Sequence, residues 1–167
     1  MVNLYLSLPL LTGVALVQTV VLSRVSLWGA RPDLMLVAVL VWAVVRGVDE
    51  ALVWGFIGGL IVDLLSGGPL GATVLALVAV AFVAGQPVGQ GIGSPVVRLV
   101  LLALPSVIVY HLVLLAVLAY TGRAVDWGGA LSQVAGPSAL LNAVLAPFVE
   151  RPLGWLERRT RREGFAL

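Results

Sequence analysis

The sequence predicts an all-α integral membrane protein with six transmembrane helices packed in one bundle. Sixty per cent of its 167 residues are hydrophobic, only 11% are charged, and the mean hydropathy is +1.10. A soluble domain carries about 25% charged residues. The apolar runs are continuous and do not alternate every second residue, which favours membrane helices over the strands of a transmembrane barrel.

The first three spans are predicted in the N-terminal part of the chain. The first covers residues 3–23, because this apolar run is too long for a cleaved signal and no basic segment precedes it. The second covers residues 32–45 and ends at a polar turn with one arginine and two acids. The third covers residues 51–65 and ends at a Ser-Gly-Gly sequence, which marks a turn.

Three further spans follow, over residues 69–86, 96–120 and 130–149. Proline suits the first turn of a helix, so Pro69 opens the fourth span, whereas Pro137 and Pro147 predict breaks or kinks in the last one. The second and third spans have roughly 15 residues, or about 22 Å of helix against a hydrocarbon core of about 30 Å. They must therefore lean on longer neighbours or lie in a thinned bilayer.

The arginines predict the orientation, because the chain contains no lysine. Six spans place seven arginines on the side of both termini, namely Arg46, Arg98, Arg151, Arg158, Arg159, Arg161 and Arg162. The other side receives Arg24, Arg31 and Arg123. The richer side is expected to be cytoplasmic. We therefore predict a multi-pass protein of the bacterial inner membrane, with a bundle over residues 1–150 and a basic cytoplasmic tail over residues 151–167.

The tail combines arginines with Leu153, Trp155 and Leu156. This mixture is typical of a short helix that lies on anionic lipid, although it could equally contact a cytoplasmic protein. The lipid interpretation is favoured because basic segments are generally attracted to that leaflet. The residues expected at the membrane surface are Arg158, Arg159, Arg161 and Arg162.

Small residues and one acid recur at every fourth position of the third span, in Gly55, Gly59 and Asp63. Such a stripe lets another backbone approach closely, and the expected partner is another helix of the same chain. Asp63 lies near the C-terminal end of its helix, where a negative charge is unfavourable. It therefore needs a partner, either the backbone N–H groups around Gly68 and Leu70 or an arginine on the same side.

The sequence argues against an enzyme and predicts no cofactor, metal or nucleic-acid partner. There is no cysteine, and His111 is the single histidine, so thiolate sites and sites with several imidazoles are excluded. His111 lies among leucines and valines and is expected to bond another helix. The glycines of residues 89–93 follow no strand and precede no lysine, so they form a turn and not a phosphate-binding loop.

Residues 31–71 resemble the signature of the MreD family of rod shape-determining proteins. The matching residues are Pro32, Asp33, Leu34, Gly55, Gly59, Asp63, Pro69 and Gly71, and Asn142 fits the C-terminal region more loosely. The resemblance implies a non-enzymatic scaffold subunit of the cell-wall elongation complex. It further implies association with MreC, the glycosyltransferase RodA, a class B penicillin-binding protein and, directly or indirectly, the actin-like MreB.

The fold implied by the resemblance is similar to that of the substrate-binding subunits of energy-coupling-factor transporters. A vitamin-capturing subunit is therefore the main alternative function. It would need an outward pocket with convergent polar groups, and few polar residues lie within the spans. A proton-coupled transporter that uses Asp63 and His111 is a third hypothesis, although no inverted repeat is evident.

Overall fold

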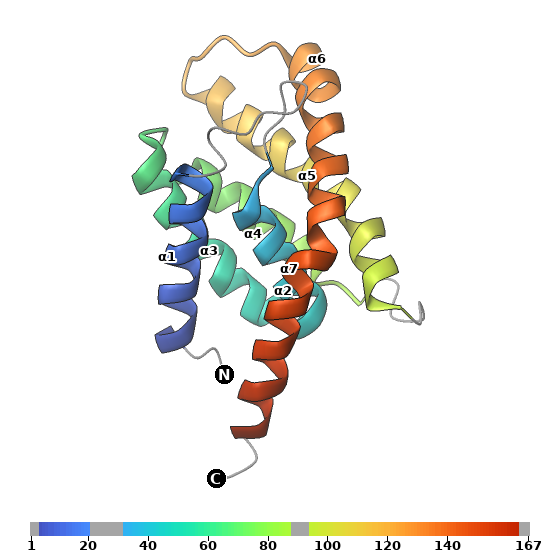
Figure 1. Cartoon of the computed structure of the whole chain (residues 1–167). Helices are drawn as coiled ribbons and strands as arrows, with labels where there is room; N and C mark the ends of the chain where they lie inside the picture. Colours follow the sequence, from blue (N-terminus) through green and yellow to red (C-terminus); the bar gives the residue numbers. More distant parts are fainter. Residues whose placement is uncertain (1–3, 21–31, 88–93, 164–167) are drawn as a thin grey trace.

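The computed structural model describes residues 4–20, 32–87 and 94–163, and every regular element in these ranges is helical (Figure 1). The predicted all-α class is therefore confirmed. The helices are α1 (Leu4–Val20), α2 (Leu34–Arg46), α3 (Val48–Ser66), α4 (Ala72–Ala84), α5 (Pro95–Tyr120), the short α6 (Trp127–Gly129), a π-helix (Ala130–Ala135) and α7 (Gly136–Glu163).

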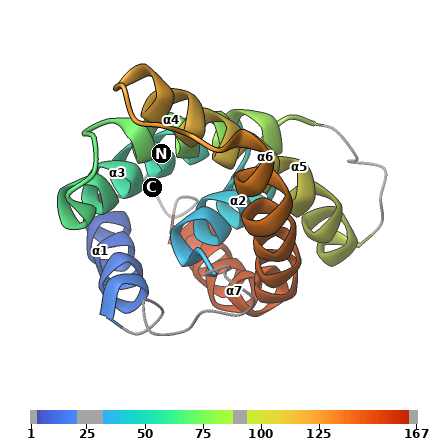
Figure 2. The ribbon, with the colours of Figure 1, turned by 90° about the horizontal axis from the view of Figure 1, so that it is seen from above.

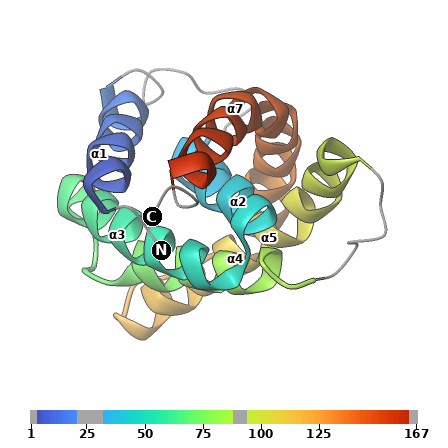
Figure 3. The same ribbon diagram turned by 90° about the horizontal axis from the view of Figure 1, so that it is seen from below.

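Helix α2 occupies the centre of the bundle. The views along the bundle show it surrounded by α1, α3, α4, α5 and α7 (Figures 2 and 3). Residues 35–43 are all buried, as expected for a helix that is hydrophobic on every face. The helix in the predicted second span is thus short and packs against longer helices of the same chain.

Helices α3 and α4 form an antiparallel hairpin along one side of the bundle. The turn between them needs two left-handed residues, Gly67 at φ +65° and Gly71 at φ +93°, a conformation that glycine adopts without steric cost. Both helices run obliquely to α1 and α7 (Figure 1). The hairpin therefore extends a shorter distance along the direction of α1 and α7 than the lengths of its helices alone would give.

Helix α7 differs from the predicted last span. It continues through Pro147 and Pro152 to Glu163, so the predicted boundary at residue 150 lies inside a helix. The irregularity expected at Pro137 lies just before this residue, because a π-helical turn over Ala130–Ala135 precedes α7. At Pro147, of the break or kink that the sequence predicted, a break is ruled out, because α7 continues through this residue.

Among the described residues, one helix is long and apolar enough by itself to cross a bilayer, Val96–Tyr120. Shorter apolar helices are Ser7–Val20, Leu34–Arg46 and Ala72–Ala84. The first turn of α1 and the last turn of α7 lie at the same end of the bundle, toward the bottom of Figure 1. The α2–α3 turn lies toward this end as well, whereas the α3–α4 turn lies toward the other.

Candidate functional site: the capped starts of α2 and α4

The first backbone amides of α2 are bonded by side chains from three parts of the chain. The Asp33 carboxylate is the N-cap and accepts from the Leu36 amide at 2.9 Å. Gln18 of α1 accepts from the Met35 amide at 2.8 Å, and Asn142 of α7 accepts from the Asp33 amide at 3.0 Å. The free donors of a helix start inside a bundle are costly unless bonded, so these contacts fix α2 between α1 and α7.

A further helix reaches the same place. Tyr110 of α5 is buried, and its side chain lies near Asp33. Asp33 thus caps its own helix beside a buried side chain of α5. No sequence pattern pointed to Tyr110, because a single tyrosine within an apolar helix belongs to no motif. Gln18 was visible as a polar residue within a span, but its partner was not.

The start of α4 is capped by the buried Asp63 of α3. One carboxylate oxygen accepts from the Gly71 amide at 2.8 Å and the Val74 amide at 3.4 Å, and the other accepts from the Thr73 amide at 3.0 Å. The charge, unfavourable at the end of α3, thus lies at the positive start of α4. The bonded amides lie further along the chain than those of Gly68 and Leu70, and Gly68 instead donates to Ser66.

The small-residue stripe packs against α4 of the same chain, as the sequence indicated. A Cβ on Gly55 would lie 2.9 Å from the Leu77 carbonyl oxygen, and one on Gly59 would lie 2.5 Å from the Val74 Cα. Both clashes would be with backbone, which cannot move as a side chain can. The two glycines therefore set the close approach that lets Asp63 reach the amides of α4.

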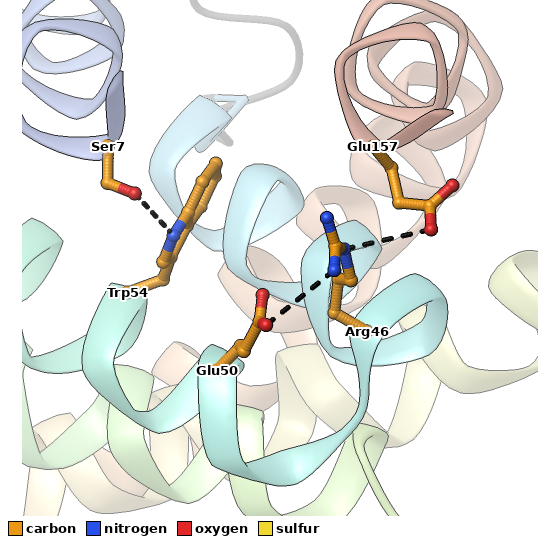
Figure 4. Close-up of polar contacts among 5 residues, drawn as sticks. All are labelled: Ser7, Arg46, Glu50, Trp54 and Glu157. Atoms are coloured by element: carbon orange, nitrogen blue, oxygen red, sulfur yellow. Dashed lines mark hydrogen bonds and ion pairs between the residues drawn. The ribbon is translucent and has the colours of Figure 1, made fainter. Parts of the chain in front are cut away.

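The opposite end of the bundle carries a second polar cluster (Figure 4). Arg46 lies 3.7 Å from Glu50 of α3 and 3.8 Å from Glu157 of α7, and its guanidinium lies 5.5 Å from the centre of the Trp42 ring. Its partners Glu50 and Glu157 are mostly buried, at 18% and 12% side-chain exposure. The predicted polar turn is therefore exposed only in part: Asp49 is exposed, whereas α7 extends far enough to cover Arg46.

Trp42 and Trp54 stack at this end, with ring centroids 4.0 Å apart. Trp54 also donates a hydrogen bond to Ser7 of α1 at 3.0 Å (Figure 4). Both rings are buried among helices and do not line the lipid interface, where tryptophans of a membrane protein often lie. They therefore join α1, α2 and α3 instead of anchoring the bundle in the bilayer.

His111 bonds its own helix and not a neighbour, because its Nδ1 lies 2.9 Å from the Val107 carbonyl oxygen. Within the described ranges, no group of three histidine, cysteine or acidic side chains could hold a metal ion. The caps are acceptors bonded to backbone donors, and this arrangement holds helices in place. It presents no nucleophile together with a base.

Several residues predicted to act at the membrane surface or as partners of Asp63 lie near the limits of the described ranges or outside them. Arg158 is exposed near the end of α7, and the side chains of Arg159, Arg161 and Arg162 lie outside the described residues. The same holds for Arg24 and Arg31, the candidate partners of Asp63, and for the glycines of residues 89–93. Pro69 and Gly71 lie in the α3–α4 turn, where the Pro69 carbonyl accepts from the Ala72 amide at 3.2 Å.

Residues 1–151 match the family of the rod shape-determining protein MreD. The chain belongs to the MreD family. It is therefore a member of a membrane protein family with a role in rod-shape determination, as the resemblance of residues 31–71 implied. No curated protein and no solved structure shows a match to it.

Proposed function

We propose that this MreD-family chain is a non-enzymatic scaffold subunit of the bacterial cell-wall elongation complex. In this role it binds MreC and links it to RodA, a class B penicillin-binding protein and, directly or indirectly, MreB. The observation that carries the proposal is the use of the signature residues. Asp33, Asp63 and Asn142 all accept from backbone amides at helix starts, which favours a rigid bundle that presents fixed surfaces to partners.

The proposal includes six membrane spans in the inner membrane, with both termini in the cytoplasm. The excess of arginine on the side of the termini supports this orientation. The shared end of α1 and α7 in Figure 1 is consistent with an even number of crossings. A likeness to the substrate-binding subunits of energy-coupling-factor transporters belongs to the same proposal. The basic end of α7 would then face anionic lipid headgroups.

The vitamin-capturing alternative gains no support from the site. A discontinuous helix start inside a membrane protein can bind an anionic ligand through its free amides. Here the amides of Asp33, Met35 and Leu36 already bond protein acceptors. A ligand would have to displace three hydrogen bonds before it gained any.

Purification in a mild detergent, followed by mass spectrometry of the bound proteins, tests the scaffold. We expect a single-span protein with a periplasmic coiled coil, the domain organisation of MreC, to remain bound. Asp63→Leu should reduce its recovery, whereas Asp49→Leu, an exposed acid in the first turn of α3, is the matched control and should not. Recovery of a vitamin or of a pair of ATPases would contradict the proposal.

A further inference from the structure

The α3–α4 hairpin presents large apolar side chains on its outer face. Phe56, Leu60 and Leu64 follow one another at four-residue spacing on α3, and Leu75 and Phe82 are exposed on α4. Leu70, in the turn, is 71% exposed. In a membrane protein such a face is suited to acyl chains, because these are as apolar as the side chains that meet them.

The apolar part of this hairpin is short. Helix α4 has 13 residues, which correspond to about 20 Å, whereas the hydrocarbon core of a bilayer is about 30 Å thick. Helix α3 is longer, but its first turn contains Asp49 and Glu50 and its last residue is Ser66. Both helices also run obliquely (Figure 1), which shortens their projection along α1 and α7.

Helix α2 is equally short at 13 residues, but lipid does not contact its middle, because residues 35–43 are buried. The α3–α4 hairpin has no such cover among the described residues, since the side chains of its outer face are exposed. The bilayer therefore meets a hydrophobic mismatch along this side of the bundle. On α5, the apolar helix Val96–Tyr120 provides about 37 Å.

The geometry points to local thinning of the lipid bilayer along the outer face of α3 and α4. The occupant of this face is lipid whose two leaflets approach each other at the hairpin, so that headgroups reach the polar turn at one end and Asp49 and Gln86 at the other. A short hydrophobic segment commonly draws in the bilayer, at a cost of fractions of a kcal/mol per Å. This inference rests on the membrane embedding given under the proposed function.

Single-cysteine labelling tests the inference, because the chain has no cysteine of its own. Nitroxide labels at Leu70→Cys and Phe82→Cys report the two ends of α4, and Leu104→Cys, exposed on α5, is the control. The protein is reconstituted into oleoyl phosphatidylethanolamine and phosphatidylglycerol vesicles. Depth is measured from collisions with oxygen and with a headgroup-anchored nickel chelate. Leu64→Cys and Val53→Cys, on α3, provide a second pair if the first lowers thermal stability.

We expect both hairpin labels to lie at headgroup depth while the Leu104→Cys label lies in hydrocarbon. A hairpin label as deep as the control would overturn the thinning and leave the spanning bundle intact. If the label at Leu104→Cys lies in water, the six-span proposal is overturned, and the proposed thinning of the bilayer is overturned with it. Dipolar broadening at Leu75→Cys would show that a second copy covers the face in place of lipid, which also overturns the inference.

Discussion

At the scale of single residues, Asp63 carries a negative charge at a position where its own helix disfavours one, and the backbone of the next helix stabilises that charge. A carboxylate at the end of α3 would face a negative helix end, but the amides of Gly71, Thr73 and Val74 surround it. Both oxygens are used, so neither half of the group is free for proton transfer without loss of a hydrogen bond. A relay role therefore competes directly with the cap.

Substitutions at Asp63 separate these two roles. Asp63→Asn keeps one acceptor oxygen but turns an N–H₂ group toward backbone donors, so we expect it to lower the free energy of unfolding by about 1–3 kcal/mol. Asp63→Leu leaves all the bonded amides without an acceptor and should cost more. Thermal unfolding in detergent measures both, with Asp49→Asn as the exposed control. Asp63→Asn protein as stable as the wild type but unable to restore rod shape would argue against the cap.

At the scale of helices, the close contact of α3 with α4 depends on glycine. Gly59→Ala brings a Cβ within 2.5 Å of the Val74 Cα, so the two helices must separate, at an expected cost of about 1–3 kcal/mol. Gly13→Ala on α1 is the matched control. No atom lies within 4 Å of its added Cβ, and alanine favours a helix by about 0.5–1 kcal/mol over glycine. Equal melting temperatures for the two variants would contradict the close-packing account.

The ion pair between α2 and α7 gives a second helix-scale prediction. Arg46→Met leaves Glu157 without the guanidinium that lies 3.8 Å away, while the methylene stem is retained. We expect the end of α7 to detach more often, so that trypsin cleaves after Arg158 several-fold faster in detergent. Arg123→Met, in the exposed turn after α5, is the control and should leave the rate unchanged. Unchanged cleavage in Arg46→Met protein would show that Leu153 and its neighbours hold the helix unaided.

The helices could be predicted from the sequence, because continuous apolar runs and their Gly and Pro boundaries are local signals. The need of Asp63 for a partner was also predictable, since a buried carboxylate at a helix end must have one, but the choice between backbone amides and an arginine was left open. The pairs Asn142–Asp33 and Arg46–Glu157 could not be predicted. Their members are far apart in the chain, and only the packing of α7 on α2 brings them together. The continuation of α7 to Glu163 as one helix was not predicted, because its packing on α2 and α5 is not a local signal.

At the scale of the whole molecule, the orientation in the membrane is open to a direct test. A phosphatase reporter that is active only in the periplasm should be inactive when fused after Leu167 and active when inserted after Arg123. The seven arginines on the side of the termini are the reason for this expectation. Protein level and membrane fraction, measured by immunoblot, control for unequal expression. Activity after Leu167 would rule out an even number of crossings with a cytoplasmic start.

The two capped helix starts differ in when they can form during synthesis. Asp63 accepts hydrogen bonds from amides 8 to 11 residues further along the chain. The α3–α4 hairpin can therefore form these hydrogen bonds by itself as soon as it leaves the ribosome and enters the translocon. The Asp33 amide waits for Asn142, 109 residues later. The centre of the bundle thus stays incompletely bonded until the last helix arrives. A truncated chain lacking α7 would leave the Asp33 amide without this acceptor, so the final helix completes the hydrogen bonding at the centre of the bundle.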